Sequence, residues 1–160
     1  IEAENAFKTA IQNKIGDGFL NLSTEDLAKK LKKLGHRFPN ARTKYIVEAR
    51  IHHDALIKLL KSKHTDSYLR EWLVKHIKGI GYKESSHFLR NIGHTECAII
   101  DFHIIDLLVH YKVIKKPKTI TKKAYLNIEK KLKRIGKMIN LNMAELDFYL
   151  WYLETGKILK

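Results

Sequence analysis

The chain of 160 residues contains 31 Lys and Arg against 17 Asp and Glu, which gives a formal net charge of +14 at pH 7. So large a positive charge predicts a polyanionic partner, and DNA, RNA and an anionic membrane surface all satisfy it. The single cysteine, Cys97, excludes an internal disulfide framework and a four-cysteine iron–sulfur cluster within the chain. No stretch approaches the roughly 18 apolar residues of a membrane span, and residues 1–10 do not resemble a signal peptide, so a soluble cytoplasmic protein is expected.

Apolar residues recur at helical spacing along most of the chain, and the alternating runs typical of strands are absent, so the sequence predicts an all-α domain. In the first part of the chain, Ser23 or Thr24 is suited to cap a helix that Gly35 ends. A loop at residues 36–40 follows, and the helical pattern then resumes over about residues 41–60.

The rest of the chain shows the same helical punctuation. Another helix is expected behind Thr65, and the run Lys78-Gly79-Ile80-Gly81 separates it from the next. Asp101 is well placed to cap the helix after that, and residues 115–121 form a basic linker. The expected helices of this part cover about residues 66–77, 82–92, 102–111, 124–139 and 142–156.

The run between the two central helices is a candidate anion site. Gly79 and Gly81 allow the backbone to turn tightly and to approach a ligand without an intervening Cβ. The N–H groups of the turn lie at the N-terminus of the following helix, where they and the helix dipole suit a DNA phosphate. An ordinary glycine C-cap with a tight turn is the alternative, and the two glycines alone favour it. The residues that follow favour the phosphate site.

Lys83 follows this hairpin, and the run Ile100-Asp101-Phe102-His103 comes later in the chain. Together they resemble the helix-hairpin-helix DNA glycosylase superfamily, whose pattern is a glycine-apolar-glycine hairpin with a nearby lysine, followed by an apolar-Asp-x-His turn. In that family the lysine is the nucleophile and the aspartate assists it. The resemblance extends over about residues 34–160 and is greatest to the archaeal and bacterial 8-oxoguanine glycosylases of the Ogg2 type.

The resemblance implies an all-α helix-hairpin-helix fold without an iron–sulfur cluster, built as a single unit over residues 1–160. Its hairpin would cover about residues 66–93, and C-terminal helices at about residues 122–160 would complete the base pocket. The implied activity is that of a bifunctional DNA glycosylase and AP lyase of base excision repair, which flips 8-oxoguanine out of duplex DNA and excises it. No cofactor is implied. The expected state is a monomer on double-stranded DNA containing an oxidised purine, associated with the nucleoid and not with a membrane.

The chemistry of such a reaction suits the two residue types. Loss of a damaged base builds positive charge at the anomeric carbon of the sugar, and the Asp101 carboxylate can stabilise that charge. The unprotonated amine of Lys83 can attack the same carbon and form a Schiff base, which permits β-elimination of the strand on its 3′ side. The alternatives are a solvated or phosphate-binding lysine and a plain helix cap, and capping by Asp101 is compatible with catalysis.

Two further pairs of residues are candidates for contacting the opened duplex and the flipped base. In the family the loop before a helix inserts a side chain into the duplex, so Phe38 is a candidate wedge and Arg37 a candidate contact to the opposite base. A surface arginine beside a core phenylalanine is the alternative. Asp147 and Trp151 share one helix face, where the carboxylate and the indole suit the edge and the face of a purine. For them the alternative is a surface aspartate and a half-buried tryptophan.

The resemblance also points to the last residue of the chain and to a backbone ion site. In the similar enzymes the final lysine helps to separate 8-oxoguanine from guanine, so Lys160 is a candidate, acting through either its ammonium or its terminal carboxylate. The nine histidines show no metal-ligand spacing, so no side-chain metal site is expected. The family's hairpin carbonyls, here those of Lys75, Ile77 and Ile80, can hold an ion that bridges to a phosphate.

Two other functions stay open at this point. The same fold could excise another oxidised base, such as an oxidised pyrimidine, because pocket shape and not the catalytic pair selects the base. A non-catalytic helix-hairpin-helix module could grip phosphate alone. The pairing of Lys83 with Asp101 argues against such a module, since binding a phosphate needs no carboxylate facing DNA.

Overall fold

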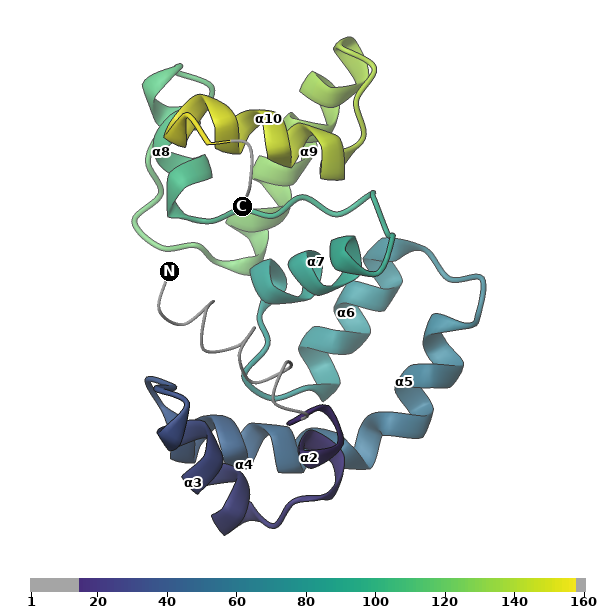
Figure 1. Ribbon diagram of the computed structural model, residues 1–160. Helices are drawn as coiled ribbons and strands as arrows, with labels where there is room; N and C mark the ends of the chain where they lie inside the picture. Colours follow the sequence, from purple (N-terminus) through teal and green to yellow (C-terminus); the bar gives the residue numbers. More distant parts are fainter. Residues whose placement is uncertain (1–14, 158–160) are drawn as a thin grey trace. The chain divides into compact units, whose positions relative to one another are not determined.

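The computed structural model describes residues 15–157, and within them the chain forms helices joined by loops (Figure 1). The α-helices are α2 (Ile15–Asn21), α3 (Thr24–Lys33), α4 (Pro39–Ala49), α5 (His53–Leu60), α6 (Asp66–His76), α7 (Tyr82–Asn91), α8 (Phe102–His110), α9 (Lys122–Met138) and α10 (Met143–Thr155). One 3₁₀ helix, η1 (Arg50–His52), separates α4 from α5. No strand occurs in this part of the chain, so the predicted all-α fold is confirmed.

Side-chain caps begin several of these helices, as the sequence predicts. The Ser23 hydroxyl accepts a hydrogen bond from the backbone N–H of Asp26 (3.1 Å) at the start of α3. The Asp101 carboxylate accepts one from the N–H of Ile104 (3.0 Å) at the start of α8. Each bond satisfies a donor that the first turn of a helix leaves without an intrahelical partner. The predicted caps at Ser23 and Asp101 are confirmed.

The helix predicted over residues 41–60 is wrong in two respects. α4 already begins at Pro39, because proline at the first helical position lacks only an N–H that would have no helical partner. The helix is then interrupted by η1, which starts at Arg50. The Arg50 guanidinium donates from Nε to the Phe19 carbonyl (2.8 Å) and from Nη2 to the Gly18 carbonyl (3.4 Å). The break therefore lies where a side chain binds the last turn of α2.

Contacts within the chain divide it into two compact units. The first unit contains the described residues up to 61 and residues 76–79. The second contains residues 62–75 and the described residues from 80 onward. The single unit over residues 1–160 that the resemblance implies stays a prediction. In the first unit α3 packs against α4, and the buried residues of these two helices are Leu27, Leu31 and Thr43.

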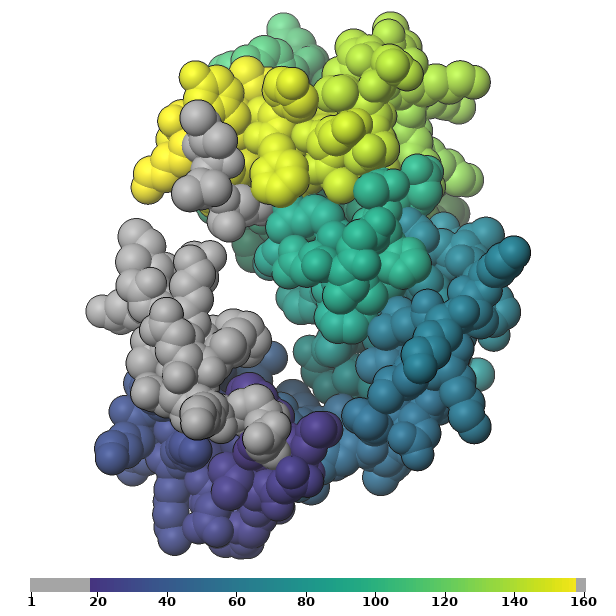
Figure 2. Space-filling view, turned by 45° about the vertical axis from the view of Figure 1, so that its right-hand side comes forward, coloured from purple at the N-terminus to yellow at the C-terminus, as the bar shows by residue number. Residues whose placement is uncertain are grey.

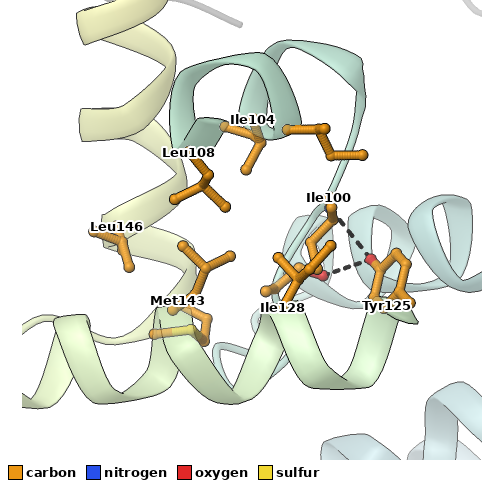
Figure 3. Close-up of a cluster of buried hydrophobic side chains, with 10 residues drawn as sticks. Ile100, Ile104, Leu108, Tyr125, Ile128, Met143 and Leu146 are labelled. Carbon is orange, nitrogen blue, oxygen red and sulfur yellow. Dashed lines mark hydrogen bonds between the residues drawn. The ribbon is translucent and has the colours of Figure 1, made fainter. Parts of the chain in front are cut away.

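The core of the second unit lies between α8, α9 and α10 (Figure 3). In the space-filling view α9 and α10 lie side by side, in yellow-green and yellow (Figure 2). Apolar side chains from one face of each helix meet in this core, because burying them removes apolar surface from water. The buried members are Ala98, Ile100, Ile104, Ile105, Leu108, Tyr125, Ile128, Leu132, Met143 and Leu146.

A buried ion pair joins α6 to α9. The guanidinium of Arg70, a residue that is 1% exposed, donates to the two carboxylate oxygens of Glu129 at 2.5 and 2.8 Å. Arg70 also donates to the Ser86 hydroxyl on α7 (3.3 Å), and Glu129 accepts from the backbone N–H of Ala98 (2.8 Å). The pair thereby connects three helices with the segment that leads to Asp101.

Tyr125 holds the same segment from α9. Its hydroxyl donates to the carbonyl of Ala98 (2.7 Å) and accepts from the N–H of Ile100 (3.3 Å), as the dashed lines of Figure 3 show. Burial raises the pKa of Tyr125 to about 12, so the hydroxyl stays protonated and able to donate. Residues 98–100 are therefore held at a carbonyl and at an N–H before the chain reaches Asp101.

Replacing Glu129 alone with leucine should destabilise the protein strongly, because it leaves the Arg70 guanidinium buried without its partner. We expect a loss of about 3–5 kcal/mol in the free energy of unfolding, measured by urea denaturation. The double variant Arg70→Met/Glu129→Leu should recover much of this loss, because apolar side chains of similar volume can replace a buried pair. A double variant no more stable than Glu129→Leu would contradict this account of the pair.

Candidate active site

The predicted nucleophile, Lys83, is the second residue of α7 and lines a cavity of about 350 Å³ in the second unit. One wall of the cavity is formed by residues 81–84 at the start of α7. Another is formed by Ile100, the residue before Asp101, and a third by the start of α9 and the residues just before it. The structure thus brings the lysine to a cavity beside the segment that ends in Asp101.

Two lysines line this cavity, and they differ in their surroundings. Lys122 Nζ donates to one carboxylate oxygen of Glu71 at 2.8 Å, and the Tyr82 hydroxyl donates to the other. Burial and then the hydrogen bond to Glu71 raise the pKa of Tyr82, which keeps this hydroxyl protonated. Within residues 18–157 no carboxylate forms an ion pair with Lys83, and that includes Asp101. Lys83 and Asp101 share the unit without being paired in this structure.

The two hairpin glycines have different roles in the fold. Gly79 has a φ of +82°, a left-handed conformation that favours glycine, and a Cβ there would lie 2.5 Å from Cδ2 of Tyr45. Gly81 has an ordinary extended backbone, with φ −97° and ψ −170°. A Cβ on Gly81 would lie 3.2 Å from a carboxylate oxygen of Glu84. The sequence predicts a need for both glycines in the turn, whereas the conformation requires glycine only at residue 79.

Asp147 lies on α10 and forms a buried ion pair. Its side chain is 2% exposed and accepts from the guanidinium of Arg90 on α7, which also lies over the Phe148 ring at 4.9 Å. The alternative of a surface aspartate is therefore wrong. The pair ties α10 to the helix that carries Lys83. The predicted contact of Asp147 with a flipped purine stays a prediction.

Trp151 lies one turn further along α10 and is half-buried. The ring of His103 meets its indole edge-on, with 5.5 Å between the ring centroids. His103 Nδ1 also lies 3.8 Å from a carboxylate oxygen of Glu154. The structure thus brings the helix of the predicted base pocket to the turn that Asp101 begins. Stacking of Trp151 on a base stays a prediction.

Phe38 and Arg37 lie in the first unit, directly before α4. Phe38 is the N-cap residue of α4 and is 54% exposed, with the Arg37 guanidinium 5.0 Å from the centre of its ring. The alternative of a core phenylalanine is wrong, because more than half of this residue lies in solvent. An exposed apolar ring beside a cation suits a wedge that enters a duplex, and that role stays a prediction.

Further expectations concern ions, membranes and the last residue. In the part of the chain that the structure describes, no three His, Cys, Asp or Glu side chains are grouped to hold a metal ion. No helix between residues 15 and 157 is long and apolar enough to cross a membrane. The carbonyl ion site at Lys75, Ile77 and Ile80 stays a prediction, and Lys160 lies outside the described residues.

Comparison with known protein families shows which family this chain is related to. Residues 1–141 match the family described as 8-oxoguanine DNA glycosylase. The chain belongs to this family. The resemblance inferred from the hairpin, Lys83 and the Asp-x-His turn is thereby confirmed.

Curated relatives of this glycosylase chain are similar over most of its length. A protein of Korarchaeum cryptofilum named 8-oxoguanine DNA glycosylase/AP lyase is 51% identical over 151 residues, which cover 94% of this chain and 72% of the relative. A Thermotoga maritima protein of the same name is 43% identical over 148 residues, which cover 92% of this chain and 70% of the relative.

Solved structures of such glycosylases share the fold. The crystal structure of the Methanocaldococcus jannaschii 8-oxoguanine DNA glycosylase matches with a TM-score of 0.85 at 50% identity, over 95% of this chain and 71% of that one. A crystal structure of the enzyme from the same organism, in complex with a 15mer DNA containing 8-oxoguanine, also gives a TM-score of 0.85. Its identity is 49%, and the match covers 95% of this chain and 73% of that one.

Sequence reasoning missed the residues that position this glycosylase site. Arg70, Glu129 and Arg90 are charged residues within helices, and in a chain of net charge +14 such residues suggest solvated faces. A signal for Glu129 lies in its spacing, since it comes four residues after Tyr125 and three before Leu132, on the apolar face of α9. A carboxylate on an apolar face predicts a buried partner.

The Arg90–Asp147 pair predicts how α10 responds to substitution. Asp147→Ala should cost about 3–5 kcal/mol in the free energy of unfolding, because the largely buried Arg90 guanidinium would lose its partner. Asp147→Asn should cost less, since an amide oxygen can still accept from the guanidinium. Urea denaturation measures both variants. Unchanged stability of Asp147→Asn together with lost excision of 8-oxoguanine would instead place Asp147 against the base.

Proposed function

We propose that this chain is a bifunctional DNA glycosylase and AP lyase that excises 8-oxoguanine from duplex DNA. The names of its relatives and the DNA complex of the Methanocaldococcus jannaschii enzyme support the activity and the substrate. The observation that carries the proposal is the cavity at the start of α7, which Lys83 lines together with the residue before Asp101. A cavity with an amine on its wall suits nucleophilic attack on a sugar carbon, and Asp101 follows directly after a residue that lines this cavity.

Lys83 acts as the nucleophile. Its unprotonated amine forms a bond to C1′ of the damaged nucleotide as the bond from C1′ to the base breaks, and the base leaves with the bonding electrons. Loss of a proton from the nitrogen and opening of the sugar ring give a Schiff base, from which a C2′ proton and the 3′ phosphate are eliminated. No ion pair holds Lys83 among residues 18–157, which supports this role because a paired ammonium would first have to be released.

Asp101 stabilises the positive charge that builds at C1′ as the base leaves. Its carboxylate is held by the N–H of Ile104 (3.0 Å), and the backbone before it is held by the Tyr125 hydroxyl. A charge that is already in position needs little reorganisation during the reaction, and this is what makes such a carboxylate effective. The cap and the catalytic role of Asp101 therefore support each other.

The rest of the site grips the duplex and the flipped base. The N–H groups at the start of α7 bind a phosphate, because the first N–H groups of a helix have no intrahelical partners. Phe38 enters the stack where the base has left, and Arg37 contacts the opposite base. Trp151 stacks on the flipped purine, and Lys160 separates 8-oxoguanine from guanine. The protein acts as a monomer in the cytoplasm, at the nucleoid.

Borohydride should trap a covalent complex between the protein and a duplex containing one 8-oxoguanine, because reduction converts the Schiff base into a stable amine. Lys83→Gln should keep its affinity for the duplex and lose both trapping and strand cleavage. Denaturing electrophoresis of the labelled duplex measures these products, with an oxidised-pyrimidine duplex as the comparison substrate. Cleavage by Lys83→Gln at the wild-type rate would overturn the assignment of the nucleophile.

Asp101→Asn should slow excision of 8-oxoguanine by about 10²-fold or more in single turnover, because it removes the stabilising charge. Its amide oxygen can still cap α8, so the melting temperature should change little. Rapid quenching with enzyme in excess measures the rate, and thermal melting checks the cap. A single-turnover rate equal to that of the wild type would remove Asp101 from the mechanism.

Substitutions at the two hairpin glycines should affect different properties, folding at Gly79 and phosphate binding at Gly81. Gly79→Ala should lower the melting temperature, because alanine is strained at a φ of +82° and its Cβ would clash with Tyr45. Gly81→Ala should fold normally and yet bind damaged and undamaged duplex about tenfold more weakly, because the hairpin reads backbone and not sequence. Thermal melting and fluorescence anisotropy measure the two effects. Wild-type affinity in Gly81→Ala would argue against the phosphate contact.

A further inference from the structure

Glu84 lies at the hairpin that the proposed function assigns to a DNA phosphate. It is the third residue of α7, and its Oε2 accepts a hydrogen bond from the backbone N–H of Gly81 at 3.3 Å. Glu84 is exposed and lines the same cavity as Lys83. A carboxylate therefore lies on one of the N–H groups that a phosphate would use.

The N-cap residue of α7 supplies no side-chain cap, in contrast to the N-cap residues of four other helices. Side-chain oxygens of Ser23, Asp101, Thr121 and Asn142 cap the first turns of α3, α8, α9 and α10. At α7 the N-cap residue is Gly81, which has no side chain with which to cap. The first N–H groups of any helix form an anion site. At this one the chain itself supplies the anion, through Glu84.

We propose that Glu84 occupies the phosphate site of the hairpin in the free protein and that a DNA phosphate displaces it on binding. The inference rests on the phosphate contact of the proposed function. A phosphate and a carboxylate at hydrogen-bonding distance from the same N–H would repel each other. A Cβ atom on Gly81 would also lie 3.2 Å from this carboxylate, so Glu84 lies close to Gly81 on its side-chain side as well as at its N–H. Its displacement therefore lowers the affinity for DNA.

Displacing Glu84 should reduce the free energy of binding by the same amount on every duplex, because the hairpin contacts the phosphate backbone and not the bases. A chain of net charge +14 has general affinity for any duplex through its lysines. Glu84 weakens that general binding at one phosphate. It thereby shortens the time that the protein spends on undamaged DNA without altering its preference for a lesion.

Glu84→Gln tests the inference, and Glu145→Gln is its matched control. Glu145 is the exposed third residue of α10, and it accepts from the N–H of the N-cap residue Asn142 at 2.9 Å, as Glu84 accepts from Gly81. Both substitutions remove one negative charge and keep an oxygen that can accept the capping hydrogen bond. Only Glu84→Gln removes the charge from the hairpin, and thermal melting compares the folding of both variants.

Fluorescence anisotropy with an undamaged duplex at one fixed salt concentration should give about three- to tenfold tighter binding for Glu84→Gln than for Glu145→Gln. In a Lys83→Gln background, which does not cleave, a duplex with 8-oxoguanine should show the same ratio. Equal affinities of the two variants, or weaker binding by Glu84→Gln, would overturn the inference. A gain confined to damaged DNA would place Glu84 in the base pocket and would overturn it as well.

A second variant and a separate reaction complete the test. Glu84→Ala removes the charge and the acceptor together, so it should bind the undamaged duplex at least as tightly as Glu84→Gln. Borohydride trapping by the wild-type protein tests the glycosylase function independently. Trapping together with equal affinities of Glu84→Gln and Glu145→Gln rejects the role of Glu84 alone, whereas absence of trapping by the wild type rejects the glycosylase function.

Discussion

The ion pair between Arg70 and Glu129 is the interaction on which the second unit depends. Both side chains are almost fully buried, so each is stable only in the presence of the other. Arg70 also donates a hydrogen bond to Ser86 on α7, the helix of the predicted nucleophile. Glu129 accepts one from the backbone N–H of Ala98, three residues before Asp101. The two predicted catalytic residues are therefore connected, through short stretches of backbone, to one buried pair of charges.

Side chains hold α7 at its first residue, where the Tyr82 hydroxyl donates to Glu71, and at two points further along, whereas its first N–H groups have no intrahelical partners. Ser86 accepts from Arg70 in the middle of the helix, and Arg90 binds Asp147 of α10 near its end. The first turn instead follows a glycine hairpin and has an exposed glutamate as its only side-chain cap among the described residues. The helix thus combines a fixed body, which sets the position of Lys83, with an N-terminus whose donors can exchange one anion for another.

The helices, the caps at Ser23 and Asp101 and the family could be predicted from the sequence, because capping and glycine signals act within a few residues. The partners in the buried ion pairs could not be predicted in this way. A charged residue in a helix is ordinarily solvated, and the partner of Arg70 lies 59 residues away. The break of the predicted helix at Arg50 has the same origin, since the Phe19 carbonyl that it binds is 31 residues distant.

The hairpin also marks a junction in the chain. Residues 76–79 belong to the first unit and the residues from 80 onward to the second, so the chain crosses between the units after residues 61, 75 and 79. A fragment that ends at residue 61 would lack Gly79, against which the Tyr45 ring lies. No single cut therefore yields two complete units. A chain made by joining two independent domains end to end would pass from one unit to the other only once. Here it passes three times, so neither unit can be isolated by truncating the chain at one end.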